Sequence, residues 1–208
     1  MPQRCSTRYE RDLRNQGYHA IAGVDEAGRG CLFGPVYAAA VILNPERPIR
    51  GLNDSKLLDE PTREALAPVI QERALAWAVA CASAAEIDRI NILQASRLAM
   101  KRAVEALSIS PDYLLVDFVA VDLPLPQLGL VNGDGLSRSI AAASILAKTA
   151  RDARMREYDR QYPGYGFARN KGYGCREHLF ALDELGLLPE HRYCYAPVRD
   201  RAQRKLFL

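Results

Sequence analysis

The sequence has no apolar stretch long enough to cross a membrane. Its longest, from Val36 to Leu43, is far shorter than the ~20 residues that a membrane helix needs. The N-terminus, MPQRCSTRYERDLRNQ, carries charges without the apolar stretch that follows them in a secretory signal. We therefore expect the protein to remain in the cytoplasm.

Cysteine pairs at metal-binding spacing are also missing. The five cysteines are an odd number and none forms a C-x-x-C pair, which is typical of reduced thiols rather than of a zinc site or a disulfide framework. His178 and His191 lack ligand spacing too, so we expect structural roles for them. No G-K-S or G-K-T phosphate loop is present, which disfavours an NTPase.

What is present fits one globular domain with a tail. The chain has 208 residues, of which 49% are apolar and 25% charged, an ordinary globular composition. The net charge of +3 says little, but nine Lys or Arg oppose three Asp or Glu between Arg138 and Arg176. Such an excess suits a phosphate backbone, although a solvated basic helix would show it as well.

The apolar pattern predicts a mixed α/β layer. Strands are expected at Ile21–Glu26, Val36–Leu43, Ala76–Ser83, Tyr113–Asp117 and Leu128–Val131. Helices are expected from Asp59, where Pro68 should kink or end the helix, and at Ser83–Leu107, Ser137–Gln161 and Arg176–Leu185. Trp77, on the third strand, is expected in the core. A hairpin of strands followed by alternating helices and strands favours a mixed sheet flanked by helices.

Carboxylates stand where three of these strands end. They are Asp25 with Glu26, Asp117, and Asp134. An acid on a buried strand is costly unless it is paired or holds a metal, and oxygen ligands without Cys or His suit Mg²⁺ or Mn²⁺. Two such ions would suit phosphodiester hydrolysis. The alternative is that these acids cap helices or form turns. Asp25 and Glu26 would also need a bend to reach one site, because adjacent strand residues face opposite ways.

The long helix at Ser137–Gln161 carries polar residues on one face. Ser137, Ser144, Lys148 and Asp152 are seven and four residues apart. A hydroxyl and an ammonium beside alanines suit phosphate contacts. A Lys148–Asp152 surface pair would give the same spacing.

Seven motifs follow one another along the chain: GVDEAGRG at 23–30, GPV at 34–36, DSK at 54–56, LLVD at 114–117, NGDGLSRSIAAASILAKTARD at 132–152, YPGYGFARNKGYGCREH at 162–178 and HR at 191–192. Together these motifs resemble the type 2 ribonuclease H family, and within it the bacterial ribonuclease HII branch. They follow one another in the family's order, over roughly residues 18–198.

The resemblance implies a ribonuclease H-like mixed sheet flanked by helices, with a small helical C-terminal region. It implies an N-terminal segment at 1–17, a catalytic domain at 18–161, a substrate-binding helical region at 162–198 and a tail at 199–208. It also implies an endonuclease acting on RNA–DNA hybrids and on ribonucleotides embedded in duplex DNA. This enzyme would cut 5′ to the ribonucleotide with two Mg²⁺ or Mn²⁺ ions, leaving a 3′-hydroxyl and a 5′-phosphate. We expect a monomer.

Site residues carry over position by position. The resemblance implies that the catalytic and metal-binding acids are Asp25, Glu26, Asp117 and Asp134. Gly28, Arg29 and Gly30 would read the 2′-hydroxyl, Tyr173 would stack under the next deoxy sugar, and Lys56, Ser144 and Lys148 would contact phosphates. The 2′-hydroxyl is what separates RNA from DNA, and glycines let backbone groups approach it closely.

The chain departs from the family pattern at a few positions. Cys31 replaces the usual proline, Phe33 a small residue, Phe118 a glycine, Asn132 a lysine and Cys175 a threonine. None of them removes a proposed metal ligand, but Phe118 and Asn132 could change rate or affinity. The resemblance also places Cys31 and Cys175 on neighbouring loops, where oxidation could block the site if geometry permits.

Two other functions compete with this interpretation. Gly28, Gly30 and Gly34 after a strand imitate a dinucleotide-binding fingerprint, with Asp54 beyond them, but that motif requires a helix where the sequence favours a strand. A nucleic-acid-binding module without catalysis would need a broken set of acids, and here the set is complete.

The end of the chain has a pattern of its own. Gln203–Leu208 reads QRKLFL, which looks like the short peptides that dock on the bacterial sliding clamp. The alternatives are that it folds back on the chain's own core or contacts DNA.

Overall fold

A computed structural model of the chain describes residues 5–204. Its strands are β1 (Ile21–Ala27), β2 (Val36–Ile42), β3 (Ala76–Ala82), β4 (Tyr113–Asp117) and β5 (Gln127–Leu130). Its helices are α1 (Arg8–Asn15), α2 (Glu60–Arg73), α3 (Ala84–Glu105), α4 (Arg138–Gln161), α5 (Phe167–Asn170), α6 (Arg176–Leu185) and α7 (Ala196–Arg204), with a 3₁₀ turn η1 (Gly133–Gly135). None of the helices in this part of the chain is long and apolar enough to cross a membrane.

The five strands form one mixed sheet in the order β3-β2-β1-β4-β5. β1 is antiparallel to β2, which is antiparallel to β3, whereas β4 runs parallel to β1 and β5 parallel to β4. The carboxyl ends of β1, β4 and β5 therefore lie at the same edge. The three predicted groups of acids lie near the ends of β1 and β4 and in the turn after β5, which brings them to the same edge.

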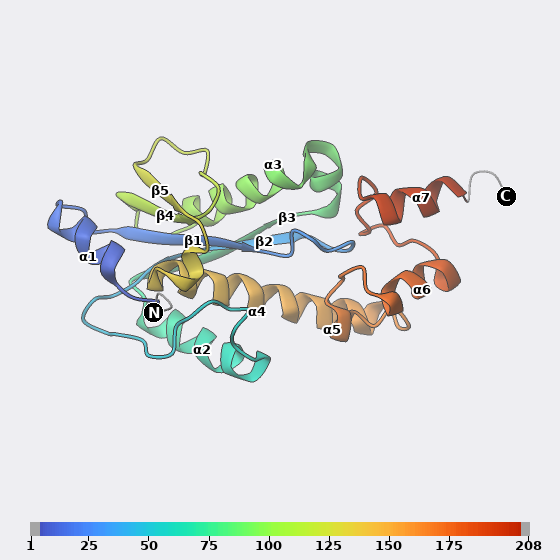
Figure 1. The fold of residues 1–208 in the computed structure, drawn as a ribbon, viewed down its shortest axis with the longest axis horizontal. Helices are drawn as coiled ribbons and strands as arrows, with labels where there is room; N and C mark the ends of the chain where they lie inside the picture. The colour runs from blue at the N-terminus through green and yellow to red at the C-terminus, as the bar shows by residue number, and fades with distance from the viewer. Residues whose placement is uncertain (1–4, 205–208) are drawn as a thin grey trace.

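Helices cover both faces of the sheet (Figure 1). On one face α3 packs on β1, β2 and β3, and the apolar cluster on this face includes Val24, Met100 and Leu114. On the other face the alanines of α4 pack on β2 together with Ile70 of α2. Gly23 has no Cβ because one would lie 2.0 Å from the carbonyl carbon of Ser139, so α4 crosses directly against β1.

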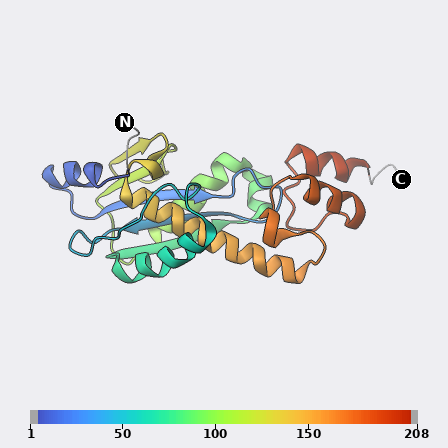
Figure 2. The ribbon, with the colours of Figure 1, turned by 60° about the horizontal axis from the view of Figure 1, so that its bottom comes forward.

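The C-terminal helices pack around the far end of α4 (Figures 1 and 2). Phe33, from the loop after β1, is fully buried there between Tyr158 of α4 and Phe167 of α5. This apolar cluster around Phe33 joins the glycine-rich loop to the C-terminal region.

Several predicted boundaries are wrong in detail. Helix α2 does not end at Pro68 but continues to Arg73. Helix α3 changes direction at Asn91, where φ is +67°. Helices α1, α5 and α7 were not predicted, and α7 takes in the first residues of the segment expected to be a tail.

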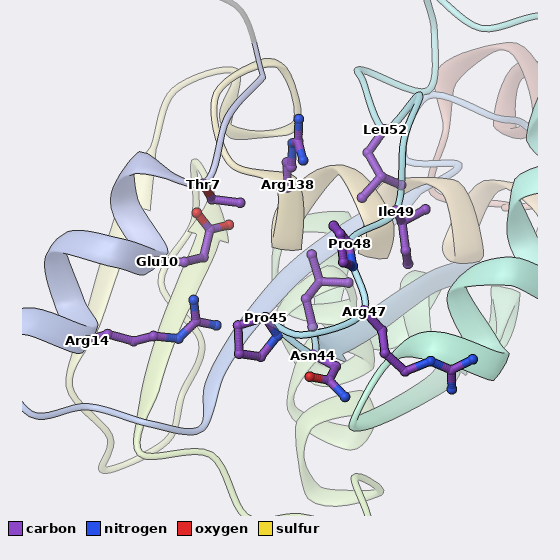
Figure 3. A pocket seen from close by; sticks show the side chains of 11 residues that line it. Thr7, Glu10, Arg14, Asn44, Pro45, Arg47, Pro48, Ile49, Leu52 and Arg138 are labelled. Atoms are coloured by element: carbon purple, nitrogen blue, oxygen red, sulfur yellow. The ribbon is translucent and has the colours of Figure 1, made fainter.

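Helix α1 is held against the start of α4 by a buried carboxylate. Glu10 is 2% exposed, and its Oε1 accepts hydrogen bonds from the Ser137 hydroxyl at 2.7 Å and the Ser139 amide at 2.9 Å. Figure 3 shows Glu10 at the wall of a small pocket between α1 and the 44–52 loop. Because Ser137 also caps α4, Glu10 ties the N-terminal helix to the chain that follows Asp134.

Candidate active site

One cleft at the carboxyl edge of the sheet gathers nearly every predicted site residue. It is lined by Asp25, Glu26, Gly28, Arg29, Gly30, Lys56, Asp117, Ser144, Lys148 and Tyr173, together with Ala27 and Ser55. Asp134 lies at its side, 1% exposed, with Oδ2 3.5 Å from the Lys56 ammonium. The sequence motifs come from six elements or loops and meet only in the folded chain.

The four acids belong to three elements. Asp25 and Glu26 are the fifth and sixth residues of β1, Asp117 ends β4, and Asp134 lies in the 3₁₀ turn. The strand does not bend between Asp25 and Glu26, as we had expected. Both residues pair regularly with β2, opposite Ala39 and Ala38. Their position near the end of the strand is what lets both border the cleft.

Burial raises the pKa of every one of these acids. The pKa of Asp25 lies well above its usual range because of burial and the nearby charges of Glu26 and Asp117. Burial also raises the pKa of Glu26 against the opposing effect of Arg29, and raises that of Asp117. The pKa of Asp134 rises to about 6 through burial, which outweighs the Lys56 charge. Such a cluster of like charges favours binding of a cation.

The chemistry of these side chains fits a divalent cation. All four supply carboxylate oxygens, the ligands that hard cations prefer. Two buried oxygens, Glu26 Oε2 and Asp134 Oδ2, have no hydrogen-bond partner among residues 5–204. Mg²⁺ or Mn²⁺ is therefore compatible with the residues present.

The acids do not, however, form a ready-made cage. Within residues 5–204, no three His, Cys, Asp or Glu side chains are grouped so that they could hold a metal ion. Three of the carboxylates instead accept a backbone hydrogen bond: Asp25 from Glu26 at 2.7 Å, Asp117 from Gly133 at 2.7 Å, and Asp134 from Gly135 at 3.0 Å. Joint coordination would need these side chains to turn toward the ion.

Lys148 and Asp152 do pair, but not on the surface. The Lys148 Nζ–Asp152 Oδ1 distance is 2.5 Å, and Asp152 is only 2% exposed. Burial lowers the pKa of Lys148, which still borders the cleft. The alternative of a solvated surface pair is therefore wrong.

The 54–58 loop is fixed beside this pair by Arg63, which the sequence did not single out, and by Ser144, which it did. Arg63 of α2 lies 3.7 Å from the second oxygen of Asp152 and donates to the Ser55 carbonyl at 3.0 Å. The Ser144 hydroxyl donates to the Ser55 hydroxyl at 2.8 Å. These contacts hold Lys56, next to Ser55, at the mouth of the cleft.

The glycine-rich loop lies against Tyr173. The chain turns at Gly28, where φ is +97°, and a Cβ there would lie 2.0 Å from Arg151 Nε. A Cβ on Gly30 would instead lie 3.8 Å from the Tyr173 ring. Cys31 and Tyr173 form an antiparallel bridge, so the two predicted substrate-reading segments are neighbours.

Two buried arginines support this loop from beneath. Arg151, 1% exposed, donates to the Lys171 carbonyl at 2.8 Å, and its guanidinium lies 5.9 Å from the centre of the Tyr173 ring. Arg192, fully buried, donates to the carbonyls of Arg29 and Gly34, each at 2.9 Å. Sequence analysis assigned neither a site role; the HR motif was the one available signal for Arg192.

The two cysteines expected near this loop differ in environment. Cys31 is fully buried, and burial raises the pKa of its thiol, whereas Cys175 is exposed. Their sensitivity to oxidation stays a prediction.

Comparison with known proteins places the chain in a family. The family model for ribonuclease HII matches residues 22–198. A ribonuclease HII of Solibacter usitatus is 56% identical over 200 residues, covering 96% of this chain and 88% of that protein. The fold resembles ribonuclease H2 of Pyrococcus horikoshii, with a TM-score of 0.74 at 24% identity over 88% of this chain and 97% of that one.

A second structure, of a PCNA:RNase HII complex from Archaeoglobus fulgidus, matches with a TM-score of 0.69 at 23% identity, covering 83% of this chain and 91% of that one. These likenesses confirm the expected fold. On the extent of the family match and the identity to its members, this chain belongs to the ribonuclease HII family.

Proposed function

We propose that this ribonuclease H hydrolyses the phosphodiester on the 5′ side of a ribonucleotide, in RNA–DNA hybrids and at single ribonucleotides in duplex DNA, leaving a 3′-hydroxyl and a 5′-phosphate. Because the chain belongs to the ribonuclease HII family, it is an endoribonuclease of RNA–DNA hybrids. The position of the cut and the choice of a single ribonucleotide are supported by the shared cleft, in which the acids adjoin the glycine-rich loop and Tyr173.

Asp25, Glu26, Asp117 and Asp134 would hold the metal. Two Mg²⁺ or Mn²⁺ ions, when bound, would supply the positive charge that activates water and stabilises the leaving oxygen. The chain's own residues would do the positioning. Lys56 and Lys148 would receive phosphates of the substrate, and Ser144 would support the phosphate contacts through Ser55.

The glycine-rich loop would select the ribonucleotide. Gly28 turns the chain over Arg151, Gly30 leaves the backbone of this segment open to a sugar, and Arg29 is anchored to Glu26 at 3.3 Å. Tyr173, which is 46% exposed beside Gly30, offers a ring face on which the next deoxy sugar could lie. Residues 18–161 would thus carry catalysis and residues 162–198 substrate binding, in a monomer.

The test is a labelled duplex that contains one ribonucleotide, incubated with and without Mg²⁺ or Mn²⁺. We expect one cut, 5′ to the ribonucleotide, that depends on the metal and is lost in Asp25→Asn, Asp117→Asn and Asp134→Asn. A cut at another position, or variants that cleave at the parent's rate, would contradict the proposal.

The chain's end gives a second proposal, that residues 203–208 bind a sliding clamp. Its Leu-Phe-Leu segment lies outside the described residues, so the support is the QRKLFL pattern and the A. fulgidus relative solved with PCNA. Calorimetric titration of the clamp with the full chain and with a chain ending at residue 202 tests it. Equal binding by both, or binding by neither, would end the proposal.

A further inference from the structure

Phe118 stands in an unusual backbone conformation directly after Asp117. Its φ is +61°, in the left-handed region that bulky residues avoid. The Val119 amide donates to the Asp117 carbonyl at 2.7 Å, which closes a three-residue turn around Phe118. Three-residue turns with positive φ are rare and strained, and such strain tends to occur at functional sites.

The side chain of Phe118 gains no burial in return for this strain. It is 66% exposed and belongs to none of the apolar clusters formed by residues 5–204. Leu130, on the neighbouring strand, is by contrast 8% exposed and packs in the core beside α1. The folded chain alone therefore gives no reason for an aromatic residue at position 118.

Val131 lies beside it with the same degree of exposure. The last paired residues of β4 and β5 are Asp117 and Leu130, and the Phe118 amide donates to the Leu130 carbonyl at 3.0 Å, so the next residues of the two strands adjoin. Val131 is 65% exposed. Gly129 allows this close pairing, because its Cβ would lie 3.1 Å from the Phe118 carbonyl oxygen.

This apolar pair, Phe118 and Val131, adjoins the acids on the side away from Tyr173. It follows Asp117 in β4 and precedes the turn that carries Asp134. β1 lies between β4 and β2, and Tyr173 is bridged to the loop that follows β1. A duplex bound across the acids would thus have Tyr173 on one flank and the apolar pair on the other.

We infer that Phe118 and Val131 form a contact surface for the substrate duplex on the 5′ side of the ribonucleotide, opposite the flank that Tyr173 contacts. The inference rests on the proposed function. A wide, shallow minor groove presents sugars and base edges to flat apolar side chains, and such contact is independent of sequence. The strained turn would serve to hold the ring at this position.

The experiment compares Phe118→Gly with the parent. Glycine accepts the positive φ, so the variant should fold and its melting temperature should rise. Affinity for a hybrid with long flanks, measured by anisotropy without divalent metal, should fall about tenfold, in the range for loss of one aromatic–base contact. KM should rise by a similar factor with a much smaller change in kcat. On a duplex shortened at the 5′ flank the loss should shrink toward none, and Val131→Ser should show the same pattern more weakly.

Ile109→Ala is the matched control, since Ile109 is 40% exposed before the start of β4, at the opposite edge of the sheet. Unchanged affinity of Phe118→Gly for the long hybrid, or an equal loss of affinity on both duplexes, would overturn the inference. Phe118→Asn, which also tolerates a positive φ, repeats the test if the glycine variant is poorly folded. A parent that binds hybrids but cuts none would instead contradict the proposed function, while the anisotropy series still tests the contact surface.

Discussion

A buried carboxylate of the cleft, that of Asp134, is expected to lower the stability of the metal-free protein. Asp134 is almost fully buried among other acids, with Lys56 as its counter-charge. An acid whose pKa rises from 3.8 to about 6 on folding binds its proton more tightly in the folded state. Its contribution to stability is thus most favourable at low pH and is lost as the pH rises through this window.

Asp134→Asn should therefore abolish cleavage and stabilise the metal-free protein. At pH 7.5 the gain should be on the order of 3 kcal/mol, because the pKa rises by about two units on folding and one unit corresponds to about 1.4 kcal/mol, and at pH 5 it should be smaller. Thermal melts in EDTA at both pH values measure this. Asp122→Asn, at a side chain that is 91% exposed, serves as control and should change neither melt. A destabilised Asp134→Asn at pH 7.5 would show that the carboxylate supports the fold.

Two glycines of the same loop should respond differently to alanine. At Gly28 the positive φ and the Arg151 side chain 2.0 Å from the added Cβ leave no room, so Gly28→Ala should lower both stability and activity. At Gly30 the nearest atom is at 3.8 Å, so Gly30→Ala should melt like the parent. It should still lose preference for a ribonucleotide over a deoxynucleotide, because the methyl group enters the cleft. Melting curves and paired cleavage assays separate the two. Similar melts for both variants would contradict the assignment.

At the scale of elements, local sequence patterns predicted the long helix and the strands that carry the acids. They did not predict every helix that packs on these elements. The helices expected from Ser83 and Ser137 do begin there, α3 at a Ser83 capping box and α4 at a Ser137 cap. Helix α1 escaped prediction because its anchor, Glu10, bonds to residues more than a hundred positions away. Trp77 was wrongly expected in the core; it is 39% exposed because β3 is an edge strand, a position that the alternation of residues cannot reveal.

The same limits apply to the cleft. Most residues that line the cleft were predicted because they belong to motifs, and each motif is contiguous in the sequence. Arg151 and Arg192 were missed as supports because their partners are backbone carbonyls, which leave no mark in the sequence.

Removal of the Glu10 carboxylate should loosen the link between α1 and α4. Glu10→Ala leaves the Ser137 hydroxyl and the Ser139 amide without their acceptor, at a cost of about 1–3 kcal/mol. Because Ser137 lies three residues after Asp134, we also expect a higher metal concentration for half-maximal activity. Denaturant unfolding and a Mg²⁺ titration measure the two effects. Asp12→Ala, at an exposed residue of the same helix, is the control. A loss of stability with an unchanged metal requirement would limit Glu10 to a structural role.

At the scale of the whole molecule, a buried pair of histidines joins the C-terminal region to the glycine-rich loop. His178 and His191 are fully buried, with their Nε2 atoms 3.2 Å apart, which confirms the expected structural role. His178 Nδ1 lies 3.0 Å from the Tyr173 carbonyl oxygen, and His191 packs edge-on against Phe33. Burial lowers the pKa of both, that of His191 to about 3 with a further contribution from His178.

Acid should therefore loosen this region before the sheet. A histidine whose pKa is lowered on folding stabilises the fold above its unfolded pKa of 6.5, and this stability is lost as the pH falls toward the folded value. Between pH 7 and pH 5 we expect amide exchange to rise in α5 and α6 and KM for the hybrid to increase as Tyr173 loses its support. His191→Gln should lower stability at pH 7 but flatten its decline with acid. His19→Gln, at an exposed histidine, should leave that decline as it is in the parent. The buried acids of β1 and β4 favour the folded state more at low pH, so these strands should not loosen first. Amide exchange that rises first in β1 and β4 would contradict the role of the histidine pair.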